Sequence, residues 1–220
     1  MTISTRDDDP VAPAGSAARR RVLAAGMTLF GTRGYNATSV AQIEEAAGLR
    51  PGSGGLYRHF ASKRQLLEDG IREQLASQGE LLDAIGDPAL FAALPLTDRL
   101  AAVAGAALDR LASERDLNRI ILRDLDRFPD LLDLVRAHEM ARIQALFARW
   151  LPAQTERPPE LDWDAVAAML IGSISHFWLL QDIFGTHPSG LDAERYLRGV
   201  AETTARILDM AAPPSAEITP

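Results

Sequence analysis

A group of aromatic and basic side chains near the amino terminus has the chemistry to bind a phosphate backbone. Tyr57, Arg58 and His59 are consecutive, and Lys63 follows about one helical turn later. Tyrosine and histidine hydrogen-bond to phosphate oxygens, whereas arginine pairs with phosphate or with the edge of a guanine base. Any one of these residues alone is more often part of a solvated surface, so the prediction depends on the elements that bring them together.

The elements predicted around this group are four helices, of which the second and third are short. Apolar residues spaced three or four apart predict helices at about 16–33 and 39–47, a short helix over GGLYRHF, and a longer helix from Ser62 to about 85. The run PGSGG at 51–55 breaks the chain between the second and third helices. Two short helices joined by a glycine-containing turn form a helix-turn-helix unit, whose second helix can enter the DNA major groove.

Local signals support this arrangement. Ser39 and Ser62 are each followed three residues later by glutamine, which is the pattern of a capping box at a helix start. Leu56 and Phe60 are spaced i, i+4 and can anchor the short helix to the first two. Tyr57 and its neighbours then point away from that anchor. The exposed start of the short helix is also expected to offer unpaired backbone amides to phosphates.

The charge of the chain is divided unevenly. The net charge is −7, but residues 1–66 carry +4 and residues 67–220 carry −11. A basic unit joined to an acidic one is expected when the basic unit meets a polyanion. Arg19 and Arg20, like Lys63, stand in the first turn of a helix, where the helix dipole disfavours a cation and a phosphate partner would supply a reason for one.

The rest of the chain is predicted to be a helical bundle. Further helices are expected at about 97–113, 115–127, 129–151, 161–184 and 192–210. The predicted fold class is all-α, with an N-terminal three-helix unit leading into a C-terminal helical bundle. The predicted division is a disordered tail at 1–15, the helix-turn-helix domain at 16–67, the bundle at 68–211 and a disordered tail at 212–220.

Residues from about 19 to 67 resemble the DNA-binding domain of the TetR (tetracycline-repressor-like) family of bacterial transcription regulators. The matching text is AAGMTLFGTRGYNATSVAQIEEAAGL followed by GLYRHFASKRQLL, about a quarter of the chain. The turn between them departs from the usual family pattern, because Leu49–Gly55 is longer and rich in proline and glycine. The resemblance implies a ligand-responsive regulator, commonly a repressor, that binds a pseudo-palindromic operator as a homodimer and is released by a small-molecule effector.

The residues and surfaces implied are as follows. The candidate DNA-binding residues are Arg19, Arg20, Thr38, Ser39, Arg50, Ser53, Gly55, Tyr57, Arg58, His59 and Lys63. The last two helices are the expected dimer surface by resemblance. Candidate effector contacts in the bundle are His138, Phe147, Trp150, His176 and Trp178, which could equally be core residues.

Composition limits the other classes of function. The chain contains no cysteine, which excludes disulfides, thiol catalysis and thiolate metal sites. The amino terminus lacks a secretory pattern, and the apolar window at 165–180 is interrupted and short for a membrane span, so a cytoplasmic protein without membrane contact is expected. No catalytic residue, metal or cofactor is predicted. The alternatives are a protein-binding adaptor and, with less support, a helical enzyme, because PGSGG follows a helix and lacks the ending of a P-loop.

Overall fold

The computed structural model describes residues 17–86, 91 and 93–210, so the tails expected at 1–15 and 212–220 lie outside the described residues. The described part is helical and contains no strand, which confirms the predicted all-α class. The helices are α1 (Ala17–Arg33), α2 (Val40–Ala46), α3 (Lys63–Gly86), α4 (Leu96–Ser113), α5 (Arg115–Arg123), α6 (Pro129–Val135), α7 (Ala141–Trp150), α8 (Trp163–Phe184) and α9 (Ala193–Leu208). Short 3-10 turns cover Leu56–Arg58 (η1), Leu125–Arg127 (η2) and Pro152–Gln154 (η4), and a π-helical turn (η3) covers Arg136–Met140.

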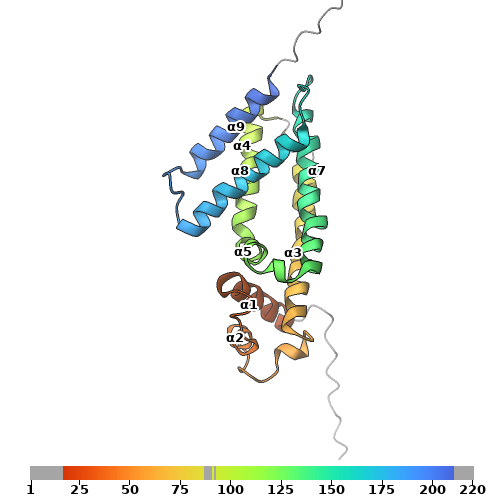
Figure 1. Cartoon of the computed structure of the whole chain (residues 1–220), viewed down its shortest axis with the longest axis vertical. Helices are drawn as coiled ribbons and strands as arrows, with labels where there is room; N and C mark the ends of the chain where they lie inside the picture. Colours follow the sequence, from red (N-terminus) through yellow and green to blue (C-terminus); the bar gives the residue numbers. More distant parts are fainter. Residues whose placement is uncertain (1–16, 87–90, 92, 211–220) are drawn as a thin grey trace, which may run out of the picture.

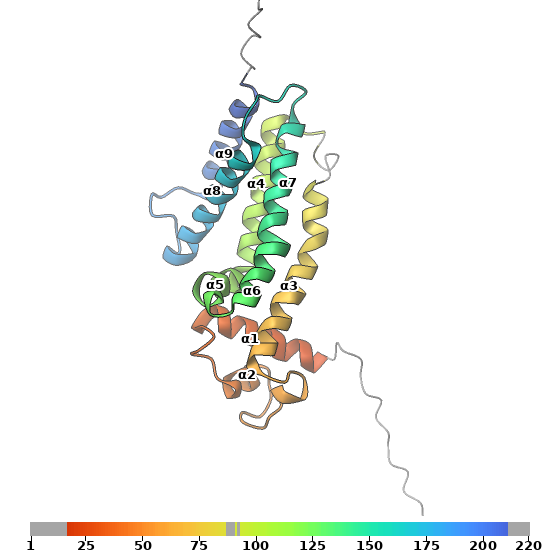
Figure 2. The same ribbon diagram turned by 45° about the vertical axis from the view of Figure 1, so that its right-hand side comes forward.

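The molecule is elongated, with two unlike ends (Figure 1). The head, which we define as α1, α2, η1 and the first turns of α3, occupies one end. From there α3 runs up one side of the molecule beside α7, while α8 and α9 lie on the opposite side and α4 and α7 between them (Figure 2). α5 lies across the junction between α1 and the long helices.

The capping patterns found in the sequence lie at the starts of α2 and α3. The hydroxyl of Ser39 accepts from the amide of Gln42, and the side chain of Gln42 accepts from the amide of Ser39, so the predicted capping box is confirmed. At the next start the hydroxyl of Ser62 accepts from the amide of Gln65, whose side chain accepts from the amide of Ala61 instead of Ser62.

The core of the head continues into the bundle. One cluster of buried side chains joins Phe30, Ile43 and Leu56 of the head to Leu117 and Ile120 of α5. The expected domain boundary at residue 67 therefore falls inside α3 and within a continuous core. The bundle contains two further clusters, one around Trp150 and Leu151 and one around Phe177 and Trp178.

Close helix contact holds α5 against α1. A Cβ atom at Gly31 would lie 2.6 Å from the Cα of Asp116, so this crossing requires glycine. The guanidinium of Arg123 donates to the carbonyls of Phe30 and Gly31 at the end of α1. The carboxylate of Asp124 accepts from the amide of Tyr35 at 3.1 Å. The last turn of α5 thus bonds to backbone groups at the end of α1 and in the loop that follows it.

The other end of α5 is tied to α8. Arg119 and Arg115 both pair with the carboxylate of Asp182, the former at 2.7 Å, and the side chain of Asp182 is 7% exposed. Burial alone would raise the pKa of Asp182, but the hydrogen bonds from the two arginines outweigh it and the net pKa is lowered. α5 therefore connects the head to α8.

Candidate nucleic-acid interface and ligand cavity

The exposed tip of the head is a single 3-10 turn. Leu56 is fully buried and Phe60 is 2% exposed, so both anchor the turn as the sequence predicts, while Tyr57 is 58% exposed and Arg58 is exposed. The helix expected over GGLYRHF is reduced to Leu56–Arg58. The preceding run explains this, because Gly52 and Gly54 adopt positive φ values of 73° and 74° that no helix contains.

A buried acid shapes the turn that precedes this tip. Glu44 is fully buried, and its two carboxylate oxygens accept from the amide of Gly52 at 2.7 Å and from the amide of Leu56 at 3.1 Å. Leu56 is the first residue of the short helix, so the expectation of unpaired amides at this start is wrong for its amide. Sequence analysis missed Glu44, although an acid beside the buried Ile43 and close to a glycine run was a usable signal.

Two candidate contacts are used inside the head. Thr38 is 1% exposed, and its hydroxyl donates to the carbonyl of Gly34 at 2.8 Å, so it holds the loop between α1 and α2 and presents no hydroxyl to solvent. The ammonium of Lys63 donates to the carbonyls of Tyr35 and Thr38 and lies over the Tyr35 ring. The sequence analysis explained a cation at this helix start by a phosphate partner. In the structure the two carbonyls are the partners of Lys63 instead. Burial lowers the pKa of Lys63.

The other candidates divide by exposure. Arg19 pairs with Asp69 at 2.8 Å and with Glu73, and it covers the ring of Phe60, so it braces α1 against α3. Gly55 is buried against Leu49. His59 is half-buried. The exposed candidates are Arg20, Ser39, Arg50, Ser53, Tyr57 and Arg58.

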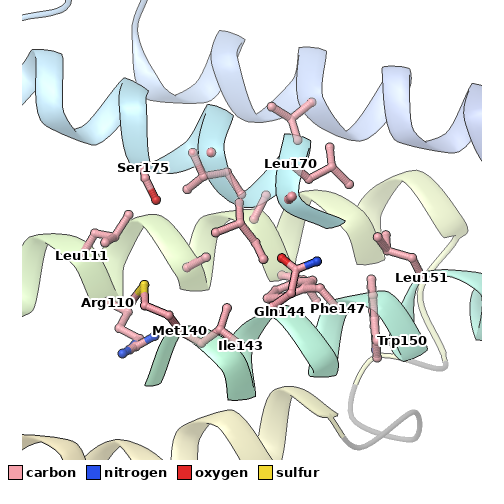
Figure 3. Close-up of a pocket in the computed structure, with 18 of the residues that line it drawn as sticks. Arg110, Leu111, Met140, Ile143, Gln144, Phe147, Trp150, Leu151, Leu170 and Ser175 are labelled. Atoms are coloured by element: carbon pink, nitrogen blue, oxygen red, sulfur yellow. The ribbon is translucent and has the colours of Figure 1, made fainter. Parts of the chain in front are cut away.

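A cavity of about 540 Å³ lies within the bundle, between α4, α7, α8 and α9 (Figure 3). Most of its wall is apolar, and the residues labelled in Figure 3 on that part of the wall include Leu111, Ile143, Phe147, Trp150 and Leu170. Its volume falls in the range of roughly 300–1,000 Å³ typical of small-molecule sites. A ligand that enters must therefore be largely apolar.

The predicted effector contacts are only partly brought together there. Phe147 and Trp150 line the cavity, whereas His138 and His176 are exposed outside it and Trp178 is buried in a neighbouring cluster. These three predicted contacts therefore do not line this cavity. For His138 the reason is the π-helical turn: it widens the helix, so that Glu139 turns inward in place of His138.

One end of the cavity is charged and buried. Arg110 is paired with Glu139 from the π-helical turn and, at 2.9 Å, with Glu114 at the junction of α4 and α5. Both acids are shielded from solvent, and burial raises the pKa of Glu114, although Arg110 partly offsets this. The second carboxylate oxygen of Glu139, Oε2, is buried without a hydrogen-bond partner among the described residues. The sequence did not predict this group: Arg110 and Glu114 are an ordinary i, i+4 pair, and Glu139 joins them only through the packing of the bundle.

The outer face of α8 is apolar and built from small residues. The exposed positions of α8 are Asp164, Ala165, Ala168, Met169, Gly172, His176, Ile183 and Phe184. A Cβ atom at Gly172 would meet no atom of the described chain within 4 Å. A glycine inside a helix costs about 1 kcal/mol relative to alanine. Gly172 also lines the cavity, so it lies where the cavity meets the outer face of α8. α8 is also the one helix among the described residues that is long and apolar enough to suit a membrane span.

Comparisons with known proteins agree on one family. Residues 22–69 match the model of "Bacterial regulatory proteins, tetR family". The HTH-type transcriptional repressor KstR2 of Mycolicibacterium smegmatis is 42% identical over 67 residues, which are 30% of this chain and 32% of the repressor. The matched segment thus spans about a third of that relative's length.

The fold of the whole chain has solved counterparts. A TetR-family regulator from Mesorhizobium loti superposes with a TM-score of 0.68 at 21% identity, covering 89% of this chain and 98% of that one. The regulator FadR of Bacillus subtilis, solved in complex with stearoyl-CoA, superposes with a TM-score of 0.61 at 15% identity, covering 86% and 98%. Residues 22–69 therefore match the TetR family of bacterial regulatory proteins, and nearly the whole chain shares the fold of solved TetR-family regulators.

Proposed function

We propose that the protein is a ligand-responsive transcriptional repressor that acts in the cytoplasm. It binds a pseudo-palindromic operator as a homodimer and leaves the DNA when a small-molecule effector occupies the cavity of the bundle. The observation that carries this proposal is the exposed Tyr57-Arg58 pair at the tip of a head that is basic in sequence and lies at the end of the molecule away from α9.

The DNA contacts follow from exposure. Tyr57 contacts phosphate, and Arg58 pairs with phosphate or with a guanine edge in the major groove. Arg20, Ser39, Arg50 and Ser53 contact the backbone on either side. In this proposal Thr38, Glu44, Lys63 and Arg19 position the tip through their internal contacts, as does the backbone at Gly55, and His59 lies at the edge of the interface.

The outer face of α8 is proposed as the centre of the dimer contact. Small exposed residues such as Ala165, Ala168 and Gly172 let two helices approach closely, although Ala168 and Gly172 also line the cavity. The exposed Met169 and Ile183 add apolar area to bury. This contact also covers the apolar face of α8 without a membrane. A dimer places two heads on successive turns of the duplex, about 34–36 Å apart.

The effector is proposed to act through α5. Glu114 joins α4 to α5 and pairs with Arg110 at the cavity, while Arg123 at the far end of α5 holds the end of α1. A ligand that changes the position of Arg110 would shift α5 and with it the head. The ligand must bind the free and the DNA-bound arrangement with different affinity. The complex of FadR with stearoyl-CoA supports a largely apolar effector in a protein of this fold.

DNA binding is tested by the anisotropy of a labelled mixed-sequence duplex at several salt concentrations. The logarithm of the affinity should fall with the logarithm of salt by about 0.9 for each phosphate neutralised. Tyr57→Ala combined with Arg58→Ala should weaken binding about tenfold or more and flatten this dependence. Arg149→Ala, which removes an exposed cation on α7, is the matched control. Equal affinity for the head variant and the control would refute the proposed interface.

The dimer is tested by sedimentation over a range of protein concentrations. The unaltered chain should sediment as a dimer, and Gly172→Leu should shift it toward monomer by separating the helices. Ala112→Leu, at an exposed position of α4, should leave the dimer unchanged. A dimer that survives Gly172→Leu would move the subunit contact away from this face.

A protein-binding adaptor remains the second candidate, because the same basic head could meet an acidic protein. The salt-dependence measurement separates the two. Failure of the head to bind duplex DNA at low salt would favour the adaptor.

A further inference from the structure

We infer that the effector carries a hydrogen-bond donor, either a protonated amine or a hydroxyl, at one end of an apolar body, and that this donor binds Oε2 of Glu139. The inference deepens the proposed function and rests on its effector site. It specifies what the cavity accepts and what it rejects, which its size and apolar wall alone do not.

The first step is the unpaired acceptor. Glu139 lines the cavity and is 4% exposed, its Oε1 accepts from Arg110, and its Oε2 is buried without a partner in the described part of the chain. A buried carboxylate oxygen without a donor costs free energy, and a ligand that supplies one removes this cost. The π-helical turn that aims Glu139 inward is a rare element that often marks functional sites.

Most hydrogen-bond donors of the cavity wall are already used within the protein. Three polar side chains of the wall already donate to backbone carbonyls: Asn118 to Leu111 at 3.0 Å, Gln144 to Asp164 at 2.6 Å and Thr204 to Val200 at 2.8 Å. Ser175, the other hydroxyl of the wall, can either donate or accept, so it does not decide between ligand types. At the charged end the unused group is an acceptor, Oε2 of Glu139. A donating ligand fits this pattern better than an accepting one.

The third step is charge. Arg110 already pairs with two carboxylates, those of Glu114 and Glu139, and Arg136 at the rim of the cavity pairs with Asp133 at 2.9 Å. An anionic ligand would have to take a guanidinium from an acid that it already binds. The buried group of Arg110, Glu114 and Glu139 has a net charge of −1, which a cation would neutralise. Carboxylates and phosphates should therefore bind weakly at this end of the cavity.

The test compares three ligands with the same carbon chain: decylamine, decan-1-ol and decanoate. Each is titrated against the full chain while tryptophan emission is recorded, since Trp150 lines the cavity. Decylamine and decan-1-ol should each bind about tenfold or more tightly than decanoate. Tighter binding of decylamine than of decan-1-ol would identify a cationic effector. Equal affinity for these two ligands would identify a neutral effector. Both outcomes support the inference.

Two variants place the preference at Glu139. Glu139→Gln should reduce the affinity for decylamine about tenfold. It should also lower the ratio of the affinity for decylamine to the affinity for decanoate. Glu114→Gln removes the other partner of Arg110 but does not line the cavity, so it should change the ratio of affinities less than about twofold. If Glu139→Gln does not fold, the ranking of the three ligands on the unaltered chain decides.

Several results would overturn the inference. Decanoate binding as tightly as the amine would show that the cavity accepts an anion, and equal losses in the two variants would assign the effect to Arg110. Absence of binding by all three ligands would contradict both the ligand class and the cavity as the effector site. Binding of duplex DNA, measured on the same preparation without ligand, tests the DNA-binding part of the proposed function separately.

Discussion

The head and the cavity end of the bundle both bury charged or polar side chains, but they pair them in different ways. In the head, Thr38 bonds to a carbonyl four residues away and Glu44 to an amide twelve residues away. At the cavity, Arg110 pairs with Glu139 across 29 residues. The partners in the head are backbone groups, whereas those at the cavity are other charged side chains.

This difference fits what each region has to do. A tip that contacts DNA must hold one shape, and bonds to the fixed backbone of the head maintain it. An effector site has to respond to a ligand, and side-chain pairs between helices can change partners when the helices move. We therefore expect substitutions in the head to alter local order and substitutions at the cavity to alter the stability of the whole chain.

The largest effect is expected at the cavity. Arg110→Met leaves Glu114 and Glu139 as buried carboxylates without their cation, which should lower the free energy of unfolding by about 3–5 kcal/mol in urea denaturation at fixed protein concentration. Arg72→Met, which removes an exposed pair with Glu68, should cost about 0.5 kcal/mol or less. Equal losses of unfolding free energy in the two variants would mean that the buried group of Arg110, Glu114 and Glu139 stabilises the fold no more than a surface ion pair does.

A smaller effect is expected where the two regions meet. Gly31→Ala forces a Cβ atom to within 2.6 Å of Asp116, so α1 and α5 must separate, and the loss should be about 1–3 kcal/mol. Gly105→Ala is the matched control, because its nearest neighbour would be Leu197 at 3.7 Å, and it should stabilise by up to about 1 kcal/mol through helix propensity. An unchanged thermal midpoint for Gly31→Ala would show that the head does not depend on this contact.

Within the head the expected effect is local. Glu44→Gln replaces a carboxylate that accepts from the amides of Gly52 and Leu56 by an amide group with only one acceptor oxygen. The free energy of unfolding should therefore fall by about 1–2 kcal/mol. Amide hydrogen exchange at Gly52 and Leu56 should accelerate, while exchange in α7 and α8 stays as it was. The exposed Glu45→Gln is the control. Faster exchange throughout the bundle would contradict the separation of the two regions.

The smallest effect concerns the link between α5 and α8. The pKa of Asp182 lies below its ordinary value of 3.8 in the folded chain, so its pairs with Arg115 and Arg119 stabilise the fold fully above that value. The contribution disappears as the pH falls through the folded pKa. Asp182→Asn should therefore cost up to about 1 kcal/mol at neutral pH and nothing in strong acid, measured by urea denaturation at each pH. The exposed Asp109→Asn should show no such dependence, and a cost for Asp182→Asn that is constant with pH would exclude the ionic contribution.

The same difference between the regions governs what the sequence could predict. The helix starts at Ser39 and Ser62 and the anchors Leu56 and Phe60 depend on spacings of three or four residues, which are visible in the sequence. Helix ranges were also close, although the range predicted at 115–127 ends as α5 at Arg123 and continues as a 3-10 turn. Short-range patterns therefore identified most of the fold.

The cavity could be predicted only in part, for a physical reason. Phe147 and Trp150 share one helical face, so a regular helix placed both on the wall. The π-helical turn rotates His138 outward and Glu139 inward, and no residue type announces such a turn. Arg110 and Glu139 come together through the packing of α4 against the π-helical turn. Their pairing is a property of the assembled bundle.

The proposal that the head contacts a duplex in two symmetric copies is tested most directly by selecting bound sequences from random duplex DNA. The full chain should enrich an inverted repeat whose half-sites lie about 10–10.5 base pairs apart, centre to centre, or at a multiple of that spacing. The Tyr57→Ala, Arg58→Ala double variant should enrich nothing. A single unrepeated motif, or no motif from the unaltered chain, would contradict the account.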